Sequence, residues 1–144
     1  MGSGVADERS AIGTLFNTAW GSTNPTIPVA WPNRPFTPPA GSWVRLTIVG
    51  SDSKAVEIGP RSQERRTGTV IVQVFTTLDK GDALGLGLAD TVAGIFRNQR
   101  VAAGDAGDIL FRKPRTRSIG VDAEKAFWQI NVEVPFQHDA VLTA

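Results

Sequence analysis

The sequence predicts an α+β fold, in which two main helices pack on one face of an antiparallel or mixed β-sheet. Two segments repeat apolar residues at the spacing of an amphipathic helix, and others alternate apolar and polar residues as half-buried strands do. The 144 residues suit a single domain, residues 1–144. We expect loose ends at residues 1–5 and at a C-terminal tail, residues 138–144.

The first helix is predicted over residues 6–20. Its apolar stripe consists of Ile12, Leu15, Phe16, Ala19 and Trp20. Asp7 and Glu8 fall in the first turn, where the helix dipole favours negative charge. Gly21 is a natural end.

A long proline-rich loop is predicted over residues 21–42, with one short edge strand possible within residues 27–31. Irregular connections of this length are usually functional. Trp31 and Phe36 are costly to leave in water, so they pack either on this chain's own core or on a neighbouring subunit. Both interpretations remain open for these two residues. Trp43 begins a strand, which favours the chain's own core.

Strands are predicted over residues 43–49, 54–58 and 64–77. Gly59 and Pro60 interrupt the second of these, and Gly68 marks a bulge or bend in the third. A second helix follows over residues 82–97, with Asp82 as N-cap. Short strands are expected over residues 101–120, and a final alternating strand over residues 126–136.

The apolar phases of these segments define a predicted core. It consists of Leu15, Phe16, Val44, Leu46, Val72, Val74, Leu88, Val92, Ile95, Trp128, Ile130 and Val132.

Composition argues against catalysis. The chain has no cysteine, which excludes disulfides and thiolate chemistry, and its one histidine, His138, is expected to be a solvated tail residue. We expect no metal, no cofactor and no enzymatic activity. No apolar run is long enough to cross a membrane, and the first residues lack a secretory signal. The absence of cysteine leaves the compartment open, with the cytoplasm as the default expectation.

Basic residues form two clusters in a chain whose net charge is +1. The clusters are Arg61, Arg65 and Arg66, and then Arg112, Lys113, Arg115 and Arg117. They are typical of a solvated face, of ion pairing between subunits or of phosphate binding, although no aromatic residues interleave with them to stack bases. We expect Arg65, Arg66, Arg115 and Arg117 to face a neighbouring subunit, a tube or a lumen. Pairing of all four with acids of their own subunit would leave that role unsupported.

The ordered set of motifs resembles the phage tail terminator family over residues 8–137. The similar elements are the loop "WPNRPFTPP" with the strand "WVR", the arginine-rich approach to "GTVIVQVF", the helix from "KGDA" to "IF", and the final strand "FWQINVEVPF". The resemblance implies an α+β subunit without catalytic residues. It also implies a hexameric ring that caps the head-proximal end of the tail tube, stops tube growth and contacts the head connector.

The implied partners are further copies of the chain, the tail tube protein and the head connector or head-completion protein, with DNA passing through the lumen without sequence-specific binding. The implied location is the virion tail, after assembly in the host cytoplasm. Alternatives are a tail tube, tail-completion or head-closure protein, and less favourably a nucleic-acid-binding module. The candidate contact residues are Trp31, Pro32, Arg34, Phe36, Arg61, Arg65, Arg66, Arg112, Lys113, Arg115 and Arg117.

Overall fold

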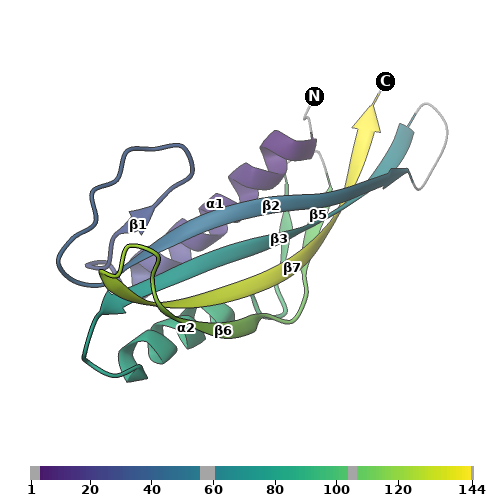
Figure 1. Ribbon diagram of the computed structural model, residues 1–144. Helices are drawn as coiled ribbons and strands as arrows, with labels where there is room; N and C mark the ends of the chain where they lie inside the picture. The colour runs from purple at the N-terminus through teal and green to yellow at the C-terminus, as the bar shows by residue number, and fades with distance from the viewer. Residues whose placement is uncertain (1–3, 56–60, 104–106, 144) are drawn as a thin grey trace.

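The computed structural model describes residues 4–55, 61–103 and 107–143, and it has the α+β fold that the sequence predicts (Figure 1). In chain order the elements are α1 (Gly4–Thr23), β1 (Val29–Ala30), β2 (Trp43–Ala55), β3 (Arg61–Thr77), α2 (Ala83–Phe96), β4 (Arg100–Ala102), β5 (Asp108–Phe111), β6 (Arg115–Val121) and β7 (Phe127–Thr143). The predicted edge strand within residues 27–31 is confirmed as β1. The predicted chain break at residues 59–60 lies outside the described residues.

One mixed sheet carries all the strands, in the order β1-β2-β3-β7-β5-β4, with β6 also paired to β7. The long strands β2, β3 and β7 are antiparallel neighbours, and β1 runs parallel to β2. The outer edge of β7 is divided between two partners: residues 128–133 pair with β6 and residues 136–138 pair with β5. At one end the sheet therefore runs from β1 to β6, and at the other end it continues through β5 to β4.

Both helices contribute to one core on the same face of this sheet, which we call the helix face. On α1, Phe16 stacks between Trp20 and Phe96 of α2, with ring centroids 5.5 and 6.1 Å away. Burial of these side chains removes apolar surface from water, the main favourable term in folding. Most of the predicted core is confirmed as buried, while Leu15 and Trp128 are half-buried and packed against it.

A smaller cluster lies on the opposite face, which we call the open face. Trp43 and Phe75 stack there with centroids 4.1 Å apart, and Phe127 meets Trp43 edge-on at 5.7 Å. Trp43 is only 3% exposed, so the expectation that it packs in its own subunit is confirmed.

The C-terminal segment differs from the expectation. Residues 138–143 are not a loose tail, because β7 runs to Thr143 and its backbone pairs with β3 along the whole length. At the other end, α1 already begins at Gly4. The predicted strand ended at Phe136, before the polar residues that follow it, whereas pairing with the long neighbour strand β3 satisfies the backbone groups beyond that point.

Candidate functional site

The proline-rich loop is fastened to both faces of its own sheet. Trp31 meets Phe16 edge-on at 6.2 Å on the helix face, and Phe36 packs on Trp43 at 5.0 Å on the open face. Both side chains are half-buried. The structure thus places these two candidate residues against their own chain, as anchors at either side of a short exposed turn.

That turn, residues 32–35, is called the arm tip below. Pro32, Asn33, Arg34 and Pro35 are all exposed, and Asn33 has a φ of 54°, a left-handed conformation that asparagine tolerates better than most residues. Hollows flank the tip on two sides, one against α1 and one against β2. Arg34 makes no ion pair or hydrogen bond with the part of the chain that the structure describes. Two prolines and two aromatic anchors make the tip stiff and protruding.

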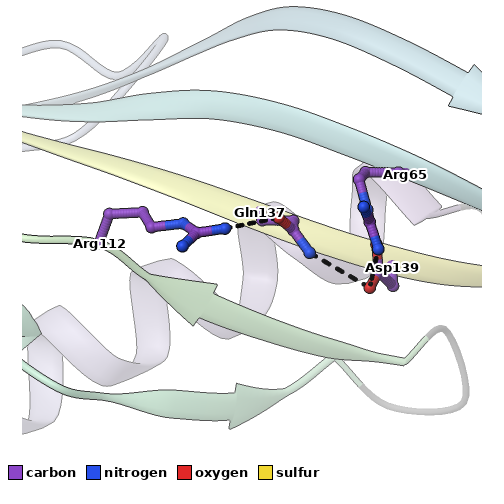
Figure 2. Close-up of polar contacts among 4 residues, drawn as sticks. All are labelled: Arg65, Arg112, Gln137 and Asp139. Carbon is purple, nitrogen blue, oxygen red and sulfur yellow. Dashed lines mark hydrogen bonds and ion pairs between the residues drawn. The ribbon is translucent and has the colours of Figure 1, made fainter.

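A polar network on the open face joins both basic clusters (Figure 2). Arg65 Nε donates to Asp139 Oδ1 at 2.8 Å, and Arg112 Nη2 donates to Gln137 Oε1 at 2.8 Å. Gln137 Nε2 in turn donates to Asp139 Oδ2 at 3.3 Å. The hydrogen bond from Arg65 lowers the pKa of Asp139, and Asp139 raises the pKa of Arg65.

Further along the same face, one carboxylate holds two arginines. Arg115 donates to Glu133 Oε1 and Arg117 donates to Glu133 Oε2, each at 3.1 Å. The register of β6 on β7 places Arg115 directly opposite Glu133. Cross-strand pairs of opposite charge stabilise a sheet modestly.

Arg66 faces the other way and joins a buried cluster under α1. Its Nε donates to Glu8 Oε1 at 3.2 Å, and His138 Nδ1 lies 3.0 Å from the same oxygen. Glu8 is 2% exposed and His138 is 0% exposed. The expectation that His138 is a solvated tail residue is therefore wrong.

The burial of Glu8 and His138 was not predicted, although the sequence carries a signal for both. Glu8 precedes Ile12 by four residues, which places it on the buried stripe of α1. His138 follows Phe136 by two residues and so shares its face of β7. Arg45 was also missed; its guanidinium lies 5.1 Å from the centre of the Trp43 ring, at cation–π distance.

The residues of the two basic clusters thus lie in different parts of the structure. All four of Arg65, Arg66, Arg115 and Arg117 pair with acids of their own subunit, so their charge no longer supports an interface role. Lys113 is exposed, and of Arg61 only the backbone is described. Arg65, Arg112, Arg115 and Arg117 share the open face, whereas the arm tip lies at the β1 edge of the sheet.

Within the described ranges, no group of three or more His, Cys, Asp or Glu side chains is placed to hold a metal ion. In the same ranges, none of the helices has the length and apolar character needed to span a membrane.

Solved structures share this fold. One chain that bears no functional name aligns with a TM-score of 0.69 at 19% identity, covering 99% of each chain. A chain from the virion of a native gene transfer agent particle aligns with a TM-score of 0.55 at 14% identity, covering 92% of this chain and 93% of the other. No curated protein sequence matches.

The chain also matches the model of a protein family. The model of a family described as phage tail terminator protein matches residues 9–136, which run from the first turns of α1 to Phe136 in β7. The matched range contains the proline-rich loop, both basic clusters and nearly the whole core. The chain is a structural protein of a phage tail and belongs to the phage tail terminator protein family.

Proposed function

We propose that this protein closes the head-proximal end of a phage tail tube as a homo-hexameric ring. The ring stops tube polymerisation and offers a surface to the head connector. The observation that carries the proposal is the family match over residues 9–136. The likeness to a chain of a gene transfer agent virion supports the fold of such a subunit.

The exposed surfaces suit contact between subunits. A stiff arm tip projects at one edge of the sheet, and exposed apolar side chains lie at the other, among them Leu84 and Val121. Contacts between two different surfaces run head to tail and close into a ring when the rotation per subunit fits. We therefore propose the arm, residues 25–40, as one side of the ring contact. Pro32 and Arg34 touch the neighbour, while Trp31 and Phe36 hold the loop.

The open face is proposed as the surface toward the tube or the lumen. Its arginines are largely neutralised by Glu133 and Asp139. A lumen lined in this way lets DNA pass without sequence-specific binding, because tight phosphate binding needs cations that are free to replace counterions. The proposed location is the virion tail, with assembly in the host cytoplasm.

The test combines solution mass, electron microscopy and tube growth. Purified protein is imaged alone and is also added to the tail tube protein of the same phage. A terminator forms a single closed layer of six subunits and stops tube elongation. Long stacks of rings would assign the chain to the tube instead. Tube growth that continues unchanged would contradict the proposal and leave a head-closure or tail-completion role.

A further inference from the structure

A hollow at the edge of the sheet opposite the arm has the shape and charge of a receiving site. It is lined by Leu78, Asp79, Gly81, Asp82, Val121 and Trp128, which come from the turn before α2, the end of β6 and the start of β7. Its volume of about 340 Å³ falls in the range of roughly 300–1,000 Å³ typical of binding pockets. We call it the α2–β6 hollow.

Exposed apolar side chains gather around this edge. Among the described residues, four of the six exposed large apolar side chains lie on the first turn of α2 or on β6. They are Leu84, Leu86, Ile119 and Val121, of which Leu84 is 56% exposed and Val121 is 50% exposed. Of these four, Val121 lines the hollow itself, and an exposed apolar residue beside a polar rim is typical of an interaction surface. The rim here is acidic, because the exposed Asp79 and Asp82 line the same hollow.

The arm adjoins β1 and the hollow is lined in part by β6, and these two strands lie on opposite edges of the sheet (Figure 1). A row of paired residues crosses the sheet between them: Val29, Val44, Val74, Ile130 and Ser118. The row spans four inter-strand spacings of about 4.8 Å, or about 19 Å. The two edge strands beside the arm and the hollow are thus about 19 Å apart, and a second copy placed beside the first can bring its tip to the hollow.

The two surfaces are chemically complementary. The tip offers two exposed proline rings and the guanidinium of Arg34, which has no partner among the described residues. The hollow offers the apolar side chains of Val121 and Trp128 with carboxylates beside them. Proline-rich segments dock in aromatic-lined grooves because little conformational entropy is lost on binding. A charged hydrogen bond from arginine to a carboxylate adds orientation.

We propose that the α2–β6 hollow receives the arm tip of a second copy of this chain. Pro32 and Pro35 pack against Val121 and Trp128, and Arg34 faces Asp79 and Asp82. This inference rests on the proposed function, because it names the partner surface for the arm in the ring. Each subunit then presents an arm at one edge and a hollow at the other, as head-to-tail closure requires.

Disulfide trapping tests the contact directly, because the chain has no cysteine of its own. The double variant Arg34→Cys with Asp82→Cys is oxidised at micromolar concentration. A disulfide requires Cα atoms within about 7 Å, and a bond between chains is told from a bond within one chain by the doubled mass of the product. We expect a ladder of linked oligomers. Mixing the two single variants should give linked dimers only.

The matched control moves one cysteine along the same helix. Asp90 is exposed on α2 beyond the first turn, so Arg34→Cys with Asp90→Cys should give little cross-linking. Equal cross-linking in both double variants, or none in the Asp82 pair, would overturn the proposed contact. Asp82 suits the substitution because its side chain makes no capping hydrogen bond to α2.

Charge reversal supplies an independent readout. Arg34→Glu and Asp82→Arg should each weaken self-association at least tenfold in sedimentation experiments, and the combined variant should recover most of that loss. Arg97→Glu, an exposed position after α2, is the control and should have little effect. If rings form and stop tube growth regardless of these changes, the hollow is the wrong receiver while the proposed function stands. A wild-type protein that neither forms rings nor stops tube growth would overturn both.

Discussion

At the scale of single residues, the buried cluster under α1 ties the two ends of the chain together. Glu8 and His138 are 130 positions apart in sequence, and Arg66 of β3 joins them. Burying charged groups is costly unless they are paired, so the three side chains depend on one another. The cluster therefore fixes the position of α1 on the far half of β7.

Replacing Glu8 should be among the more damaging single changes in the chain. We expect Glu8→Ala to lower the free energy of unfolding by about 3 kcal/mol, because Arg66 and His138 lose their shared acceptor. Urea denaturation measures the change. Asp7→Ala is the control and should cost no more than about 1 kcal/mol, the size of a helix-dipole effect. Equal losses in both variants would show that the cluster contributes little.

Asp139 should make stability depend on pH. Its pKa is lowered by the hydrogen bond from Arg65, so folding favours the ionised form. The stabilisation is present above the ordinary pKa of aspartate and is lost as the pH falls through the lower folded value. Wild type should therefore exceed Asp139→Asn in unfolding free energy at pH 7, and the difference should shrink toward pH 3. A difference that stays constant over this range would contradict the pairing.

At the scale of elements, glycines fill two different roles. A Cβ on Gly68 would lie 2.7 Å from the backbone oxygen of Val49 and 2.6 Å from the ring of Phe136. The sequence placed a bulge or bend at Gly68; the structure places the register shift on the partner strand, between Gly50 and Asp52. Gly68 thus allows close approach of neighbours beside a bulge. Gly87 on α2, by contrast, has open space around it.

Alanine at these two positions should change stability in opposite directions. Gly68→Ala should lower the free energy of unfolding by about 1–3 kcal/mol through overpacking against backbone that has no room to move. Gly87→Ala should raise it by about 1 kcal/mol through helix propensity. Urea denaturation of both variants and of wild type measures these changes in the free energy of unfolding. A neutral Gly68→Ala would mean that β2 shifts easily at its bulge.

At the scale of the whole molecule, ion pairs within the chain should limit its affinity for DNA. Net charge is +1, and Glu133 neutralises two arginines on the open face. We expect only non-specific affinity for duplex DNA, with a Kd of about 10⁻⁴ M or weaker at physiological salt. Fluorescence anisotropy at several salt concentrations measures it. Nanomolar binding would contradict this expectation and favour the nucleic-acid-binding alternative.

Glu133→Gln provides the matched test of this argument. The variant frees Arg115 and Arg117 without removing either cation, so affinity for DNA should rise several-fold and its dependence on salt should steepen. Asp90→Asn changes the net charge equally at an exposed position away from the open face. If both variants bind DNA alike, overall charge rather than local pairing controls the interaction.

The sequence alone determined the fold class, both helices, most of the core and the central parts of the long strands, although it divided β2 in two and ended β7 at residue 136. It did so because helical and strand periodicities of apolar residues directly report which side chains must leave water. Asp82 was correctly placed at the start of α2, although its side chain does not cap the helix. The family resemblance, based on ordered motifs, was also available from the sequence and is confirmed.

Only the tertiary structure decided which charged side chains are paired and which surfaces lie at opposite edges of the sheet. Arg65 and Arg66 are adjacent in sequence, yet strand alternation sends one to Asp139 on the open face and the other to Glu8 under α1. His138 is buried only because β7 continues between β3 and β5. Such ion pairs and buried contacts form between residues far apart in the chain, so the local periodicity of the sequence cannot predict them. The same long-range pairing places arm and hollow at opposite edges of one sheet.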